Sequence, residues 1–542
     1  MHLMPEEEQH PSHPTDASVV KNTGLMTVGT LLSRITGLAR TWAMAFALGN
    51  TLLTSAYQVA NNLPNVLYDL VAGGFLATAF LPVLLLEKER YGKRGANRYT
   101  SNILNITLIL LGALSILSCV FADAVVTTQT FTVGEGAEVH RRTVQFFQVF
   151  AFQIVFYGLG GVITGVLNAE RSFFLTSIAP ALNNFVVIAA FIAFALIPDQ
   201  ELGIVVLAIG TTAGVAVQFL IQIPALIKTG YRWEPYLKLK DPAIIETIKI
   251  ALPSLIYIVA NLVAYTFRNA FSLSAADNGP SALAYAWMWY QLPYGIVAVS
   301  LSSTMFTEMS DDVARGDIAS FRNHVHRGLA GTLFLIIPLT GMLFALSEPL
   351  FQLFHAGAFG GSDVTQVSNL LRVWVLSLPI YSVGMYMYKA FASLRKLMTF
   401  AVVNCAIVVL QLILYAVLCQ PGVLGLFGVP VSDMIYYTLR CAASIVLLRH
   451  YVGKGGANAV WRTAFLTVAA TAVAVVADIA LLAGDPLLSA TIGAAIGHIG
   501  VAVVEIAICG IVGLGIAFGL TKVFNVGEFA TLARIASRLR RR

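Results

Sequence analysis

Long apolar stretches, separated by short polar loops, recur along the whole chain of 542 residues. Most are about 20 residues or longer, which is the length with which a helix crosses the hydrocarbon of a bilayer. The pattern predicts an all-α polytopic membrane protein with about fourteen transmembrane helices. We place these helices at residues 25–48, 54–86, 100–122, 143–167, 173–196, 203–227, 243–272, 281–306, 326–347, 366–393, 397–419, 425–448, 460–483 and 490–522.

The composition agrees with a membrane protein. Of all residues 57% are hydrophobic and only 11% are charged, and the mean hydropathy is +0.78. Residues 1–20 are polar and include Glu6, Glu7 and Glu8, a pattern unlike a cleavable signal peptide, so we expect a disordered tail there. The five cysteines lie in or beside apolar stretches, and their spacing indicates neither a disulfide framework nor a zinc site.

Lys and Arg are distributed unevenly between the loops. They gather in every second loop, for example around Lys93, Arg232 and Lys454, whereas the intervening loops hold only Arg141 and Arg142. Cytoplasmic loops carry the excess of positive charge in membrane proteins, so the bias predicts that both termini are cytoplasmic. It also accounts for the net charge of +6, and nucleic acid is not needed as a partner to explain that charge.

Two segments of the chain share one spacing of residues. The stretch "YGLGGVITGVLNAER" carries a Tyr, a Gly three positions later and an Arg fourteen positions later, and "YSVGMYMYKAFASLR" repeats this spacing. In each half an earlier helix contains Ala-Tyr followed by Leu-Pro, ending at Pro64 and at Pro293. The repeat predicts two six-helix lobes in parallel orientation, an arrangement in which transporters bind substrate between the lobes.

The predicted segments are 1–20 (tail), 21–228 (first lobe), 229–450 (second lobe), 451–525 (an appended helix pair) and 526–542 (a basic tail, either amphipathic on the inner leaflet or unstructured).

Ionisable side chains inside the predicted spans are unusual, because each costs at least about 2.5–3.5 kcal/mol at mid-bilayer. Arg34 and Arg40 lie in the first predicted helix, Asp69 in the second and Arg268 in the seventh. If these helices line the lobe interface, the cluster there is cationic. It then predicts an anionic substrate, since arginine matches phosphate in bidentate geometry.

Structural roles are the alternative for the same charges. Arg34 would then pair with Asp69 as a lock between two helices, and Arg40 would extend its long side chain to the membrane surface. Asp433 and Arg440 are seven residues apart on one helical face, and there we expect a structural pairing, either within that helix or with another helix.

Two smaller groups of residues complete the candidates. Ser33 and Gly37 share a helical face with Arg40, so Ser33 is a candidate to contact substrate and Gly37 to serve the same motif. Glu505 and His498 are also seven residues apart in the last predicted helix, and they are weaker candidates for a proton site.

The segment "SRITGLAR", followed by "NNLPNVLYDLVAGGFLATAFLPVL", resembles the MurJ/MviN family, lipid II flippases of the multidrug/oligosaccharidyl-lipid/polysaccharide exporter superfamily. The resemblance extends over about residues 22–450, and the motif of the first two helices is specific to the family. The positions that match are Ser33, Arg34, Gly37 and Arg40 in the first helix and Pro64, Asn65, Gly74, Phe80 and Pro82 in the second.

The resemblance implies a flippase that moves a polyprenyl-pyrophosphate-linked saccharide, the peptidoglycan precursor lipid II, from the inner to the outer leaflet of a bacterial plasma membrane. The arginines named above would hold its pyrophosphate, and a groove along the last two helices would hold its lipid tail. No cofactor is implied; a coupling ion or the membrane potential is left open. Membrane lipids and proteins of cell-wall synthesis or division are candidate partners.

The chain departs from the family pattern in two helices. Many members carry an Arg-Arg pair and an acid in the second helix, where this chain has Tyr68, Asp69 and Gly73. Many also carry Asp-Arg in the eighth, where it has Trp287 and Met288. Substrate contacts outside the first helix therefore differ from the family pattern.

Three other functions remain open at this stage. One is export of another polyprenyl-linked saccharide or of a drug. A second is a polytopic glycosyltransferase or ligase, although the longest predicted outer loop, 122–142, has no paired-acid motif. A third is a scaffold for wall synthesis, which would not require buried arginines. The sequence has no phosphate-binding P-loop, so we do not expect direct use of ATP. The resemblance to flippases implies a transporter and not an enzyme.

Overall fold

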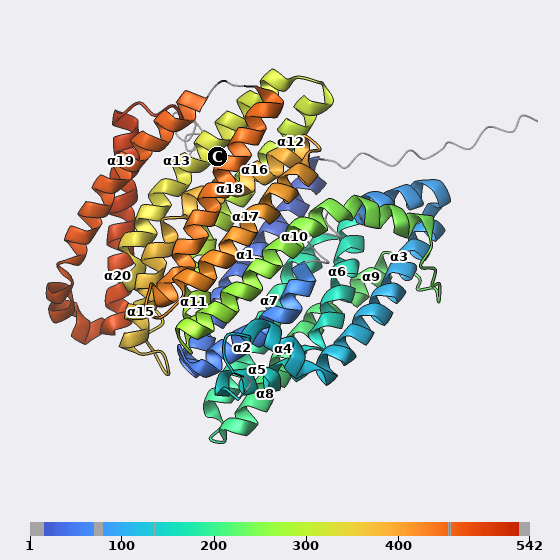
Figure 1. The fold of residues 1–542 in the computed structure, drawn as a ribbon, viewed down its shortest axis with the longest axis horizontal. Coiled ribbons are helices and arrows are strands. Elements are labelled where there is room, and N and C mark those ends of the chain that lie inside the picture. Colours follow the sequence, from blue (N-terminus) through green and yellow to red (C-terminus); the bar gives the residue numbers. More distant parts are fainter. Residues whose placement is uncertain are drawn as a thin grey trace, which may run out of the picture.

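The computed structural model describes residues 16–69, 80–134, 136–170, 172–453, 455 and 457–529. The described chain consists of long helices that lie side by side, joined by short loops (Figure 1). Its first half contains α1 (Asp16–Leu48), α2 (Leu52–Asp69), α3 (Leu81–Val120), α4 (Ala122–Thr130), α5 (Glu138–Phe150), α6 (Gln153–Ala169), α7 (Phe173–Leu196), α8 (Gln200–Leu220) and α9 (Ile223–Lys228).

The second half repeats a similar series and adds two long helices at its end. Its elements are α10 (Pro242–Ala275), α11 (Gly279–Pro293), the π-helical turn η2 (Tyr294–Ala298), α12 (Val299–Ala314), α13 (Ile318–Ala345), α14 (Ser347–Gln352), α15 (Gly361–Val375), α16 (Leu378–Ser393), α17 (Leu397–Leu418), the 3-10 turn η3 (Gly425–Phe427), α18 (Gly428–Val452), α19 (Ala457–Leu482) and α20 (Asp485–Val523).

The predicted count of about fourteen spans is not confirmed. The described residues contain 8 helices that are long and apolar enough to cross a membrane, or up to 11 if each bent pair of helices is one span. The predicted spans left out are 25–48, 54–86 and 281–306. The first carries two arginines, the second runs through residues outside the described part, and the third is interrupted by η2.

Helix α3 corrects one predicted loop. Residues 87–99 were expected to connect two spans, because the stretch is rich in charge. In the structure they belong to α3, which bends at Gly92, whose φ of 64° is outside the helical range. Glycine adopts this conformation at little cost, so the polar stretch stays helical on both sides of the bend.

The predicted internal repeat is visible in how the helices pack. In the first half α1 packs against α7, α7 against α8, α3 against α6 and α2 against α5. The second half repeats the order, with α10 against α17, α17 against α18, α13 against α16 and α11 against α15. The fold is therefore two helical lobes related by a parallel repeat. The lobe boundaries near 228 and 450 remain predictions.

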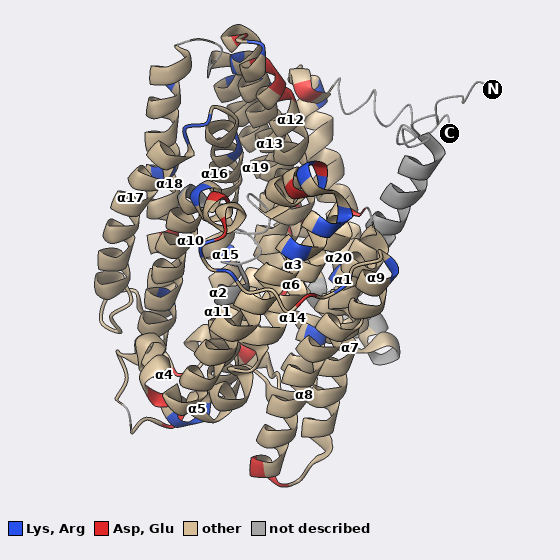
Figure 2. Ribbon diagram, turned by 90° about the vertical axis from the view of Figure 1, so that its right-hand side faces the viewer, with Lys and Arg blue, Asp and Glu red and all other residues tan. Residues whose placement is uncertain are grey.

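The last two helices form an appended pair. In Figure 1 α19 and α20 stand at one edge of the molecule, where both pack against α13 of the second lobe. Figure 2 shows Lys and Arg concentrated over the half of the bundle around α3, α9 and α12, with few at the opposite end near α8. This agrees with the uneven loop charges of the sequence.

Candidate functional site

Two hollows adjoin where the first lobe meets the second. Their volumes are about 550 and 310 Å³. α2 contributes to the walls of both, as do α10 and α11, so the two lobes enclose the space together. We call the combined space the interlobe cavity. Residues that line both hollows are Asn62, Asn65, Tyr265, Arg268 and Trp287.

The two arginines of α1 lie in different places. Arg40 lines the smaller hollow. Arg34 lines neither; its guanidinium lies against η2 of the second lobe, where a Cβ added to Gly295 would be 3.5 Å from Arg34 Nη2. Side chains six positions apart on a helix point in directions that differ by about 240°, so Arg34 and Arg40 reach different surroundings. Among the described residues, neither arginine has a hydrogen bond or an ion pair.

Ser33 and Gly37 face another helix of the first lobe. Asn184 of α7 donates from Nδ2 to the carbonyl oxygen of Ser33 at 3.3 Å and to Thr36 Oγ1 at 3.1 Å. A Cβ at Gly37 would lie 3.7 Å from the same nitrogen. This part of the motif therefore helps α1 pack against α7, and neither residue is among those that line the interlobe cavity.

Arg268 is a buried cation of the cavity, with 8% of its surface exposed. Its guanidinium carbon lies 4.1 Å from the centre of the Tyr265 ring and 5.5 Å from that of Trp287, which is cation–π geometry. Its Nε has no hydrogen-bond partner among the described residues. A buried guanidinium with an unused N–H is suited to bind an anion that enters the cavity.

Asp433 and Arg440 do not form the ion pair expected from their spacing. Asp433 is buried and accepts hydrogen bonds from Trp374 Nε1 at 3.0 Å, from Gln411 Nε2 at 2.9 Å and from the Tyr415 hydroxyl. Seven residues span about 10 Å of helix, so the two charges reach separate sets of partners. Asp433 instead lies in the same hollow as Arg268 and contributes the negative charge there.

Helix α2 bears several of the predicted motif positions. Pro64 lies inside the helix, and Asn65 lines the cavity while donating to the Asn61 carbonyl at 2.8 Å. Asn62 donates to the Tyr265 hydroxyl at 2.6 Å, which joins the lobes. Asp69 is the last residue of α2, but its side chain lies outside the described part of the structure, as does all of Gly74. The predicted pairing of Asp69 with an arginine thus remains a prediction.

Pro293, the counterpart of Pro64 in the repeat, ends α11 directly before the π-helical turn η2. Proline lacks the N–H that would continue the helical ladder, so a change of helical pitch at this point follows from the sequence. The turn brings Gly295 next to Arg34.

One end of the lobe interface is closed by hydrogen bonds, which we call the gate. The last carbonyls of a helix have no partner within it, and α1 ends at Leu48. Phe46 O accepts from Ala358 N at 2.9 Å, and Gly49 O accepts from the Tyr285 hydroxyl at 2.9 Å. Both donors belong to the second lobe, so the carbonyls of Phe46, in the last turn of α1, and of Gly49, directly after it, are satisfied across the interface.

An amide cluster completes the gate. Asn50 Nδ2 of the first lobe donates to Gln366 Oε1 of the second at 2.9 Å. Asn278 Nδ2 donates to the same oxygen at 2.8 Å and to the Asn50 carbonyl at 3.4 Å. The two lobes are therefore joined at this end by side-chain as well as backbone contacts.

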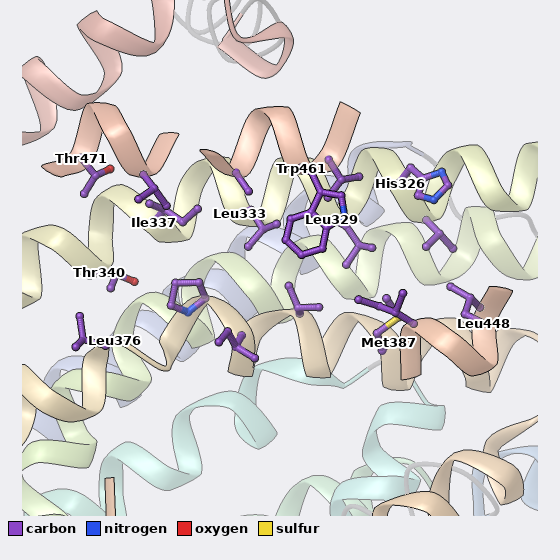
Figure 3. Close-up of a pocket in the computed structure, with 18 of the residues that line it drawn as sticks. His326, Leu329, Leu333, Ile337, Thr340, Leu376, Met387, Leu448, Trp461 and Thr471 are labelled. Carbon is purple, nitrogen blue, oxygen red and sulfur yellow. The ribbon is translucent and has the colours of Figure 1, made fainter. Parts of the chain in front are cut away.

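A long apolar groove of about 720 Å³ lies on the outside of the second lobe. Leu333 and Ile337 line its middle, and His326 and Met387 lie toward one end (Figure 3). Arg322 and Arg449 also line it. Its walls are α13, α16, α18 and α19. Of the last two helices, α19 contributes to this groove, whereas none of its described lining residues comes from α20. A groove along both of these helices stays a prediction.

The chain matches the family model "Lipid II flippase MurJ" over residues 44–492. It belongs to the MurJ lipid II flippase family. Two relatives in this family are a "Probable lipid II flippase MurJ" of Rhizobium meliloti, 28% identical over 75% of this chain and 77% of that protein, and the "Lipid II flippase MurJ" of Burkholderia cenocepacia, 28% identical over 68% and 72%.

Solved structures agree with the fold of the MurJ family. A structure titled "Lipid II flippase MurJ, inward closed conformation" superposes with a TM-score of 0.73 at 21% identity, covering 92% of this chain and 98% of that one. An inward-facing multidrug resistance MATE family transporter of the MOP superfamily has a TM-score of 0.63 at 16% identity, over 78% and 94%. The chain is therefore a multi-pass membrane protein with a transporter fold.

Sequence reasoning missed several residues of the cavity. Asn62, Tyr265, Tyr436 and Tyr437 were not singled out, although polar and aromatic residues in apolar helices were a visible signal. Their convergence depends on how α10 and α18 are placed relative to α2, and helical periodicity does not contain that information.

Proposed function

We propose that this chain flips lipid II across the plasma membrane by alternating access between its two lobes. The observation that carries the proposal is the cationic interlobe cavity. Arg40 and Arg268 line its smaller hollow, which has no acid among its described lining residues. Buried charge without a counterion is costly, so a pyrophosphate that entered would supply the missing negative charge.

The apolar groove supports a lipid-linked substrate. A polyprenyl chain has no hydrogen-bonding groups, and a wall of Leu, Ile and Met side chains suits it. We propose that the tail lies in this groove or in the adjacent lipid while the head group crosses through the interlobe cavity. Reaction at the head group is not required, so the proposed activity is transport and the lipid is recovered chemically unchanged.

The gate supplies one half of the alternating-access cycle. In the proposed cycle, the contacts of Asn50 and Gly49 with the second lobe break when the lobes rock, and substrate leaves at that end.

From the loop charges we propose that the gate faces outward and both termini face the cytoplasm. A cysteine placed at Gly95 should then be protected from an impermeant thiol reagent in intact cells; labelling from outside would contradict this orientation.

The deciding experiment measures lipid II in each leaflet of cells depleted of the native flippase and supplied with this chain. We expect wild type to restore outer-leaflet lipid II and growth. Arg40→Gln should abolish both at normal protein level, and Arg40→Lys should restore them in part, because an ammonium lacks the bidentate fork. Arg34→Ala should also fail, through the lost contact between α1 and the second lobe.

Arg372 offers a matched control. It is also an arginine in a helix of the bundle, but it pairs with Glu348 at 3.3 Å and lies outside the cavity. Arg372→Gln should therefore leave flipping intact. Equal loss with Arg40→Gln and Arg372→Gln would mean that the cavity charge is not what matters. Outer-leaflet accumulation of a different polyprenyl-linked saccharide, but not lipid II, would favour the exporter alternative.

A further inference from the structure

The larger hollow contains an aromatic pocket that the pyrophosphate contacts proposed above do not need. Tyr257, Tyr381, Tyr436 and Tyr437 line it together with Arg440, and we call it the tyrosine pocket. The ring centroids of Tyr381 and Tyr437 are 4.8 Å apart, and those of Tyr436 and Tyr437 are 5.3 Å apart. The pocket therefore presents contiguous aromatic surface with hydroxyl groups at its edges.

Arg440 is held firmly but its hydrogen-bonding capacity is not fully used. It is 5% exposed, and its guanidinium carbon lies 5.1 Å from the ring centre of Tyr436. It donates only long hydrogen bonds, at 3.3 Å to Tyr436 and 3.5 Å to Tyr257, and its Nε has no partner among the described residues. The Arg440 guanidinium packs so closely against Gly384 that a Cβ would not fit there. This close packing holds the guanidinium in place.

Neutral amides complete the wall of the pocket. Asn261 lines it and accepts from the Tyr436 hydroxyl at 3.3 Å. Gln411 also lines it, and its buried Oε1 has no partner within the described part of the chain. Buried polar atoms are normally satisfied, so an unused donor on Arg440 and an unused acceptor on Gln411 point to a ligand that offers both kinds of group.

We propose that the tyrosine pocket is a saccharide subsite, in which Arg440 donates to the sugar while the pyrophosphate lies nearer Arg40 and Arg268. This rests on the proposed function. A pyranose has an apolar C–H face that packs on aromatic rings, and its hydroxyl and acetamido groups donate and accept hydrogen bonds. A polyprenyl tail would leave the hydroxyls unpaired. The hollow, about 550 Å³, is within the range of roughly 300–1,000 Å³ for ligand sites.

The test compares two probes on the purified full-length protein: lipid II, and the same polyprenyl pyrophosphate without its sugar. We expect wild type to bind lipid II about tenfold or more tightly than the sugar-free lipid, since hydrogen bonds to a charged donor are strong. Arg440→Gln and Tyr437→Leu should each remove most of that preference while leaving affinity for the sugar-free lipid unchanged. Arg40→Gln should weaken both lipids alike.

Arg440→Lys is the control for a folding defect, because it keeps the charge and most of the volume of the side chain. Thermal unfolding reports whether each variant is folded. It should lose part of the preference through loss of the planar fork. Equal weakening of both lipids by the pocket variants, or an intact preference, would overturn the saccharide subsite. If wild type flips lipid II but binds both lipids equally, only the subsite is wrong. If wild type binds neither lipid, the proposed function is wrong as well.

Discussion

The gate offers a direct test of how the two lobes are held together. Gln366→Ala removes the oxygen that accepts from Asn50 Nδ2 and Asn278 Nδ2, at 2.9 and 2.8 Å. The first of these hydrogen bonds joins the lobes. The second orients Asn278, which itself donates to the Asn50 carbonyl across the interface. The substitution therefore weakens two contacts between the lobes without touching the backbone contacts of α1.

The size of the effect follows from the burial of these groups. A partly buried hydrogen bond contributes about 0.5–1.5 kcal/mol, so weakening two of them costs the closed state about 1–3 kcal/mol. That changes the ratio of open to closed gate by about 5-fold to 150-fold. The open state makes neither interlobe contact. The hydrogen bonds between Asn278 and Gln366 lie within the second lobe and are lost in both states, so their loss does not change the ratio.

Electron–electron distance measurements between spin labels can detect this change. Gln200, the first residue of α8 in the first lobe, and Ser362, near the start of α15 in the second lobe, are both exposed and suitable for labels. Gln366→Ala should add or enlarge a population with a longer distance. Thr365→Ala, one residue away on the exposed side of α15, is the control and should not. Identical distance distributions in wild type and Gln366→Ala would refute the reasoning, as would an equal change in the control.

Three further variants probe other parts of the molecule. Gly384→Ala should displace Arg440, lower lipid II affinity about tenfold in a binding assay and lower stability by roughly 1–3 kcal/mol in thermal unfolding; unchanged binding would show that the fixed guanidinium is not needed. Leu333→Trp should fill the apolar groove and slow flipping in proteoliposomes severalfold, whereas Val205→Trp, at a position exposed on α8, should not. Asp69→Asn should raise affinity for the pyrophosphate lipid and slow its release if, as the sequence predicts, its negative charge pairs with an arginine of α1; equal binding and turnover would argue against this role.

The hydrophobic pattern predicted individual helices well. The span predicted at 173–196 is α7, Phe173–Leu196, and the one predicted at 397–419 is α17, Leu397–Leu418. Such helices are apolar on most sides, and length and hydropathy alone define them. The helix through Gly92 was missed because a charged stretch looks the same in a loop and in a helix that extends beyond the bilayer.

The candidate site was less accessible to prediction than the helices. Helical spacing placed Asp433 and Arg440 on one face, but it could not show that Trp374 and Gln411 of neighbouring helices would hold the carboxylate. Arg268 was recognised because charge inside a span is rare, whereas tyrosines in spans are ordinary and gave no comparable signal. Partners from other helices depend on tertiary packing, which a single sequence does not specify.

The backbone contacts of the gate have a consequence for mutational robustness. Phe46 and Gly49 accept through main-chain oxygens, and every amino acid carries the same oxygen. Substitutions could therefore accumulate at the end of α1 without loss of these contacts. Gly49 is the exception, because its φ of +66° and the nearby Ala358 carbonyl leave no place for a side chain. A saturation scan of Phe46 and Gly49 should thus find broad tolerance at the first position and little at the second, so sequences that diverge at Phe46 would still close in the same way.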